Sequence, residues 1–260
     1  MPACSALWRI SVALERWRMW VVLVGLLPVI GATAGTVWNE NRYRVDGQPA
    51  YVLHSYPFRE TSLIVEVFSR DHGRVALLAR GARRPRSVLR GLLLAFQPLE
   101  LGWAGKGEVP TLMKAEWQGG QPLLTGRSLF WGYYLNELLM HLLPREDAHE
   151  RLFSVYAETL RRFADRVQEA DLRCFERALL QELGYGLTLA HDAQGLPIDA
   201  AGHYAYEIER GPVRLARAGS SALSICGKTL IDLENSDFSD PRSLIEAKQL
   251  MRTLIAHYTG

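Results

Sequence analysis

The sequence predicts an α+β protein in which a small antiparallel β-barrel precedes a mainly α-helical domain. The 260 residues are 48% hydrophobic and 22% charged, which is a globular composition. Short runs rich in β-branched and aromatic residues, separated by turn residues, fill the region 43–122. Apolar residues then recur at helical spacing through much of 123–260, except in a glycine- and proline-punctuated stretch at about 185–218. We therefore expect two domains, divided near residue 122, with a small irregular insertion in the second.

The first 42 residues differ from the rest of the chain. An uncharged run extends from Met19 to Trp38, and three arginines precede it. Its length would span a bilayer, and its flanks are also typical of a signal peptide. Pro28 and three glycines disfavour a continuous helix. A third interpretation is that translation starts near residue 40, and the residues of this run leave all three interpretations open.

The region 43–122 contains five candidate strands. The segment Ser62–Ser69 is rich in β-branched residues, and Gly73 ends a turn that leads into the next apolar run. A loop at 104–108 with two glycines separates the last two runs and is typical of a hairpin. Five strands within about 75 residues suit a closed barrel. The expected strands lie at 50–56, 62–69, 74–80, 98–103 and 111–117.

Four helices are expected after residue 124. Pro144 ends the first of them, and Gly184 stops the third, for which Asp171 is the expected N-cap. Asp240 and Pro241 together indicate the start of the last helix. The apolar face of the first helix is expected to contain Leu129, Tyr133, Asn136 and Met140, widened by Phe130 and four leucines. The expected helices cover about 125–143, 148–167, 172–183 and 241–258.

The sequence gives no indication of an enzyme active site or of a metal site. It lacks the glycine-rich phosphate loops and the nucleophile motifs of hydrolases. The adjacent pairs His191–Asp192 and Asp71–His72 are more typical of polar turns than of catalytic pairs. Three widely spaced cysteines, Cys4, Cys174 and Cys226, exclude a disulfide framework and a four-cysteine zinc site. We therefore expect no catalysis, no cofactor and no bound metal.

The segment 79–91, called the basic loop below, is the strongest functional signal. It contains five arginines and no acidic residue, and its glycines and proline disfavour a single regular helix over the whole segment. It lies in the basic part of the chain, because residues 43–124 carry eleven Lys/Arg against seven Asp/Glu, whereas residues 125–260 carry fifteen against nineteen. The loop is either a solvated basic surface or a phosphate-binding segment, since guanidinium groups pair bidentately with phosphate oxygens.

Aromatic residues of the predicted barrel offer a second kind of contact. Unpaired bases stack on exposed rings, which allows strand binding without sequence preference. The candidate rings are Tyr56, Phe58, Trp103 and Trp117. For each ring, the alternative is ordinary packing in the barrel core.

Four blocks of the sequence, taken in order, resemble the bacterial RecO recombination-mediator family. The blocks are Arg44–Ser62, Phe68–Gly73, Ala79–Ser87 and Phe96–Leu101. The similarity is strongest over 44–120 and mainly architectural over 125–258. The resemblance implies an N-terminal OB-fold, a central helical domain and a small zinc-finger-like insertion. It also implies a non-enzymatic role in DNA repair, in the cytoplasm and associated with the nucleoid.

The same resemblance implies DNA and protein partners. The family binds single- and double-stranded DNA, anneals complementary strands coated by single-strand-binding protein (SSB), and with RecR helps to load RecA. The implied DNA contacts would fall on the arginines of the basic loop, with three weaker candidates outside it: Arg80, Arg83, Arg84, Arg86 and Arg90, then Arg59, Lys106 and Lys114. The acidic tail of SSB would bind the helices at 125–184, where three arginines are candidates to pair with a tail carboxylate: Arg127, Arg161 and Arg162.

The chain departs from the family pattern in two places. Some members carry four zinc-binding cysteines in the insertion, whereas residues 185–215 contain none, so no metal is carried over. Members normally begin just before the block at Arg44, which favours a misplaced start over a genuine apolar leader at 1–42. The alternative function is a membrane-anchored or exported OB-like interaction protein that binds another anionic partner.

Overall fold

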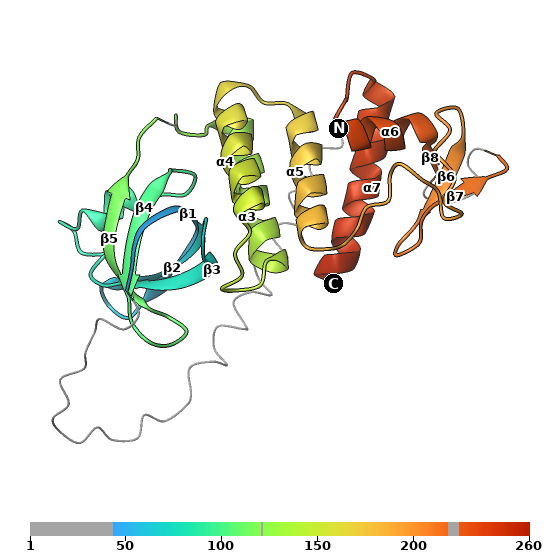
Figure 1. Cartoon of the computed structure of the whole chain (residues 1–260). Coiled ribbons are helices and arrows are strands. Elements are labelled where there is room, and N and C mark those ends of the chain that lie inside the picture. Colours follow the sequence, from blue (N-terminus) through green and yellow to red (C-terminus); the bar gives the residue numbers. More distant parts are fainter. Residues whose placement is uncertain (1–43, 121, 218–223) are drawn as a thin grey trace. The chain divides into compact units, whose positions relative to one another are not determined.

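The computed structural model describes residues 44–120, 122–217 and 224–260 (Figure 1). The apolar leader predicted for 1–42 therefore lies outside the described residues. In the part that is described, no helix is long and apolar enough to cross a membrane. Strands come first in the chain, helices follow, and a small second sheet lies among the later helices. This order confirms the predicted α+β class.

Five strands close into a barrel at the start of the described chain. They are β1 (Arg44–Phe58), β2 (Ser62–Ser69), β3 (Gly73–Ala79), β4 (Leu99–Ala104) and β5 (Thr111–Trp117). Their order around the barrel is β1-β2-β3-β5-β4, and all pairs are antiparallel except β3–β5, which is parallel. Aliphatic side chains and Trp103 fill the interior. The structure therefore confirms the predicted N-terminal barrel of the OB type.

Strand β1 is much longer than predicted, since it begins at Arg44 rather than at Ala50. Its first part pairs with β4 and its second part with β2, so one strand serves both neighbours. Shifts of register between Val45 and Gln48, and between Val52 and His54, allow the strand to bend. The start of β1 is mostly polar, so the hydrophobic pattern did not predict it. Backbone pairing with β4 does not require burial of these side chains.

Six described helices accompany the sheets. They are α2 (Leu89–Leu92), α3 (Gly126–Leu142), α4 (Glu150–Asp165), α5 (Glu169–Glu182), α6 (Gly227–Asn235) and α7 (Pro241–Thr259). Helix α7 begins as predicted, because the Asp240 carboxylate accepts a hydrogen bond from the Arg242 backbone N–H at 2.9 Å and Pro241 occupies the first turn. Helix α6 was not predicted, since a helical period is hard to recognise in nine residues.

The predicted cap of α5 was wrong. The helix begins at Glu169, and its N-cap is Gln168 rather than Asp171. Asp171 instead lies buried within the first turn, where its carboxylate accepts a hydrogen bond from Arg162 of α4 at 3.2 Å. Asp171 was predicted to cap the helix, but its side chain instead forms a tertiary ion pair with Arg162.

The predicted apolar face of α3 was also partly wrong. Phe130 and Tyr133 are 67% and 53% exposed, whereas Gly132 faces the core. A Cβ atom at Gly132 would lie 2.9 Å from side-chain atoms of both Phe96 and Leu124, so a small residue is needed there. The prediction was based on large apolar residues and therefore missed Gly132, where the helix packs closely against Phe96 and Leu124.

A three-stranded sheet lies partly in the irregular stretch at about 185–218 and partly just after it. Its strands are β6 (His203–Glu207), β7 (Gly211–Leu215) and β8 (Ser224–Cys226), in the order β7-β6-β8. The loop before it is held by hydrogen bonds, since the Asp192 carboxylate accepts from the backbone N–H groups of Gln194 and Leu196, both at 2.9 Å. Nowhere in the described ranges do three or more His, Cys, Asp or Glu side chains gather as a metal site would require.

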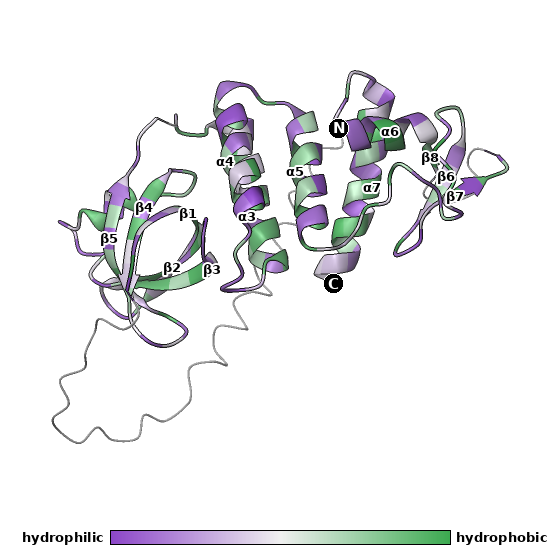
Figure 2. Cartoon of the chain, viewed as in Figure 1, coloured by the Kyte–Doolittle hydropathy of each residue, from purple (hydrophilic) through white to green (hydrophobic). Residues whose placement is uncertain are grey.

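A continuous core joins the barrel to α3 and α4. Rings of Tyr51 and Phe68 on the barrel lie 5.3 to 6.0 Å from rings of Phe153 and Tyr156 on α4, measured between centroids. The buried Asn136 amide donates to the Leu53 backbone carbonyl at 2.9 Å, and its carbonyl accepts from the Tyr156 hydroxyl at 2.5 Å. Figure 2 shows the corresponding apolar stretches on the barrel strands and along the helices. The barrel is therefore packed directly on the helical domain.

Polar contacts add to this junction at the β2–β3 turn. Gly73 has a φ of 62°, and a Cβ atom there would lie only 1.8 Å from the Asp147 backbone oxygen, so the position requires glycine. Beside it, Arg145 forms an ion pair with the buried Glu66 of β2. These contacts fix one end of the barrel against the loop between α3 and α4.

Candidate nucleic-acid interface

The basic loop begins where β3 ends and is anchored to the neighbouring turn of the barrel. The Arg83 backbone N–H donates to the Thr61 carbonyl at 2.8 Å, and Ala82 of the loop is buried in the barrel core. Gly81 supplies the positive φ of 67° that this tight path needs. As a result, the loop and the β1–β2 turn at 59–61 share one end of the barrel.

All five arginines of the basic loop are exposed. Within the described chain, no carboxylate forms an ion pair with any of them. The Arg83 guanidinium donates a hydrogen bond of 3.3 Å to the Arg59 backbone carbonyl. Five uncompensated positive charges on one short segment repel one another, and an anionic ligand would relieve that repulsion.

Arg59 extends this cluster from the adjacent turn. It has a φ of 52°, which is uncommon for a residue other than glycine. Its guanidinium carbon lies 5.3 Å from the centre of the Phe58 ring, in a cation–π contact. The structure therefore brings together Arg59 and the five arginines that sequence patterns separate by more than twenty positions.

The two predicted lysine contacts are placed differently. Lys114 on β5 forms ion pairs with Glu116 at 3.0 Å and Glu100 at 3.9 Å, and the hydrogen bond to Glu116 raises its pKa. Lys106 lies in the β4–β5 turn and lines a pocket of about 960 Å³. Lys114 therefore lacks the uncompensated setting of the basic-loop arginines, and Lys106 belongs to the pocket surface.

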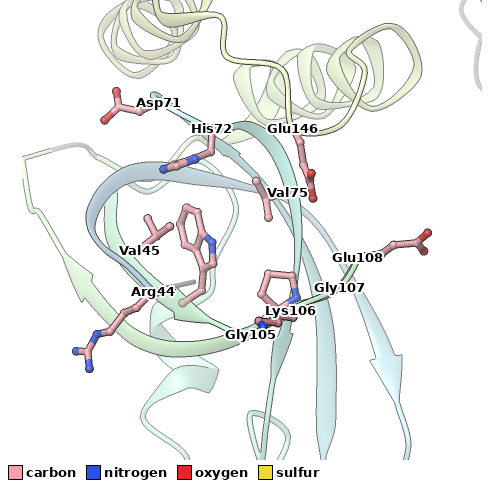
Figure 3. A pocket seen from close by; sticks show the side chains of 12 residues that line it. Arg44, Val45, Asp71, His72, Val75, Gly105, Lys106, Gly107, Glu108 and Glu146 are labelled. Carbon is pink, nitrogen blue, oxygen red and sulfur yellow. The ribbon is translucent and has the colours of Figure 1, made fainter. Parts of the chain in front are cut away.

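The pocket beside Lys106 is a second candidate surface on the barrel. Figure 3 shows His72 and Val75 pointing into the hollow, while the side chains of Arg44 and Glu108 point away from it. The His72 ring meets the Trp103 ring edge-on, with centroids 5.4 Å apart. The sequence predicted that His72 belongs to a polar turn, whereas the structure places it in the lining of this pocket, against Trp103.

The four predicted stacking rings differ in accessibility. Trp117 is 57% exposed, and its indole N–H donates to the Gln97 side chain at 3.2 Å. Trp103 is buried in the barrel, while Tyr56 and Phe58 are half-buried, and burial raises the pKa of Tyr56 to about 12. Trp117 is therefore the ring that is best placed to meet an unpaired base.

The arginines predicted to hold the SSB tail are largely engaged in ion pairs. Arg161 and Arg162 both pair with Glu158, at 2.8 and 2.9 Å, and Arg162 also pairs with Asp171. Hydrogen bonds from the two arginines lower the pKa of Glu158 to about 2. Arg127 is exposed at the start of α3, and no ion pair of this residue occurs among the described residues.

Comparison with known proteins finds two family models that match successive parts of the chain. Residues 47–120 match the Recombination protein O N terminal family, and residues 124–260 match the Recombination protein O C terminal family. The DNA repair protein RecO of Dechloromonas aromatica (strain RCB) is 69% identical over 221 residues, covering 84% of this chain and 91% of that protein. The protein of the same name from Aromatoleum aromaticum is 55% identical over 222 residues, covering 84% and 92%.

These matches cover both described domains, and they fall on the barrel and helices that the structure shows. The first ends at residue 120, after β5, and the second begins at residue 124, just before α3. The chain therefore belongs to the RecO family of recombination and DNA repair proteins.

Proposed function

We propose that this chain is a DNA-binding recombination mediator whose main phosphate-binding surface is the basic loop together with Arg59. The observation that carries this proposal is the exposure of five arginines on one loop, without an ion-pair partner in the described chain. Such guanidinium groups displace the counterions condensed on DNA and pair with phosphate oxygens. Contacts of this type read the backbone, so both single- and double-stranded DNA are substrates.

The same surface supports strand annealing without any bond-making step. Two complementary strands repel each other through their phosphates, and a shared basic surface screens that repulsion while bases pair. Trp117, and the pocket lined by His72 and Lys106, offer places for unpaired bases or backbone at the barrel surface. No group of the described residues has to act as an acid, a base or a nucleophile in this scheme, and the proposed role is non-enzymatic.

The proposed partners follow from membership of the family. In this scheme the protein works in the cytoplasm on nucleoid DNA, anneals strands coated by SSB, and with RecR helps to load RecA. Arg127 is the favoured contact for the SSB tail, because Arg161 and Arg162 would first have to release Glu158. Lys106 and Lys114 remain the weaker DNA contacts, whereas Arg59 joins the main surface because its backbone carbonyl accepts a hydrogen bond from Arg83 of the basic loop.

The direct test measures binding and annealing in an Arg83→Ala, Arg84→Ala double variant. We expect the slope of log affinity against log salt concentration to fall by about two contacts on double-stranded DNA. Annealing of complementary oligonucleotides coated with SSB should slow in parallel. Fluorescence anisotropy over a salt series and a stopped-flow annealing assay give these two quantities.

The matched control is an Arg151→Ala, Arg252→Ala double variant. Both residues are exposed on helices, and neither forms an ion pair within the described ranges, so the variant loses the same net charge elsewhere. Its salt slope should stay at the wild-type value. Equal salt slopes in the wild type and both double variants would show that the basic loop does not contact DNA.

A further inference from the structure

A small pocket formed by the segment that follows α5, by α7 and by the β6–β7 hairpin is rich in tyrosine. Its volume is about 320 Å³, which is within the range of small-ligand sites. Leu187, Ile208 and Leu254 contribute apolar atoms, and the two glycines that follow α5 complete one side. This pocket lies in the helical domain and shares no lining residue with the larger pocket of the barrel.

Three aromatic rings line this pocket. Tyr185 and Tyr258 are stacked, with centroids 4.0 Å apart and ring planes at 21°. Tyr206 lies among them, half-buried, and burial raises its pKa to about 12. The faces of such rings carry the negative end of the ring quadrupole.

One carboxylate lies at the same pocket. Glu209 has a φ of 71°, in the left-handed region that glycine or asparagine would occupy with less strain. Glu209 lines the pocket together with the three tyrosines. Burial, and after it the negative charge of Glu209, raises the pKa of Tyr258. Arg210 next to it is bound to Glu207 at 2.7 Å, whereas no cation of the described chain forms an ion pair with Glu209.

We propose that this pocket binds a protonated alkylamine, such as the side-chain ammonium of a lysine. Ring faces attract cations electrostatically, a carboxylate beside them adds a full negative charge, and the apolar floor accommodates the alkyl stem. An anionic ligand would meet Glu209 and the electron-rich ring faces, and an uncharged apolar ligand would leave Glu209 without a partner. The site is separate from the DNA surface, so it stands independently of the proposed DNA binding.

The test uses uniformly ¹⁵N-labelled full-length protein and two capped amino acids of similar size. Nα-acetyl-lysine methylamide should shift the amide resonances of Gly184 and Gly186 in a saturable manner, whereas the uncharged Nα-acetyl-norleucine methylamide should not. Spermidine is the third ligand in the test. If spermidine binds more tightly than capped lysine, the natural ligand is a free polyamine; if it binds more weakly, the natural ligand is a lysine side chain of a protein. Either ranking supports an alkylamine site.

Variants separate the charge of the pocket from its shape. Glu209→Gln should weaken binding of capped lysine roughly tenfold, since it removes the only formal charge assigned to the site. Tyr258→Phe keeps the ring and should bind as the wild type does, whereas Tyr258→Leu should weaken binding. Glu137→Gln on the exposed surface of α3 is the matched charge control. Equal shifts with lysine and norleucine, no shift with any amine, or equal weakening by Glu209→Gln and Glu137→Gln would overturn the proposal.

Discussion

Individual side chains in this protein are used in ways that depend on their partners across the fold. Arg83 and Arg162 are both surface arginines on charged segments, yet Arg162 is bound by Glu158 and Asp171, whereas Arg83 has no acidic partner in the described chain. This difference separates a structural cation from one that is available to phosphate. Arg173 in the helical domain is also a structural cation, because it forms a buried ion pair with Glu176 at 2.6 Å.

Glu176 provides a prediction about pH at the level of one residue. Burial raises its pKa to about 7, against the lowering effect of Arg173 and of the hydrogen bond from Tyr134. The folded state therefore binds the Glu176 proton more tightly than the unfolded state does. The protonated carboxyl stabilises the fold fully below the ordinary pKa of glutamate, and this stabilisation is lost as the pH rises to about 7. Urea unfolding of the wild type should therefore show a decline across this window that is absent in Glu176→Gln.

The same measurement can also contradict this prediction. If wild type and Glu176→Gln have parallel pH profiles between pH 4.5 and 7, the carboxylate is ionised throughout and Arg173 governs its charge instead. Glu137→Gln, at an exposed position of α3, should leave the profile of the wild type unchanged.

At the scale of the element, local sequence signals account for the ends of several helices. Helix α7 begins where Asp240 and Pro241 indicate, and Gly184, with a φ of 77°, follows the end of α5. These signals act within one turn of backbone, so no distant residue is needed to read them. They failed at Asp171, because a side chain on α4 competes for the same carboxylate.

The cap of α7 supports a quantitative prediction. Asp240→Ala leaves the Arg242 backbone N–H without its acceptor and should lower the free energy of unfolding by about 1 kcal/mol. Asp240→Asn retains a capping oxygen and removes only the charge, which lies 3.8 Å from Lys228. In chemical denaturation, the free energy of unfolding of Asp240→Asn should be close to that of the wild type, and that of Asp240→Ala should be clearly lower. If both variants lose the same stability, the ion pair rather than the cap is responsible.

At the scale of the molecule, the described barrel and helices share one core. Tyr51 and Phe68 belong to the barrel by sequence but pack among the rings of α4. The hydrogen-bonded pair of Asn136 and Tyr156 satisfies polar groups in the middle of this junction. The basic loop is thereby carried on a barrel that is fixed to the helical domain.

We predict that Tyr156→Phe destabilises the whole described fold. The change leaves the Asn136 side-chain carbonyl buried and unsatisfied, at a cost of about 1 to 3 kcal/mol. Tryptophan fluorescence and far-UV circular dichroism should both report the lower midpoint in one shared transition. Tyr133→Phe, on the exposed side of α3, is the control and should be close to neutral. Separate transitions by the two probes would show that barrel and helices unfold independently.

The sequence by itself determined the α+β class, the barrel followed by helices, the start of α7, the position of the basic loop and the resemblance to the RecO family. Each of these depends on local periodicity, on turn and cap chemistry, or on residues that are adjacent in the chain. Only the tertiary structure decided that β1 begins at Arg44, that α3 faces the core through Gly132, that Trp103 is buried and Trp117 exposed, and that Glu158 engages two arginines. These features depend on contacts between segments far apart in the chain, and no local pattern encodes which partner a side chain will meet.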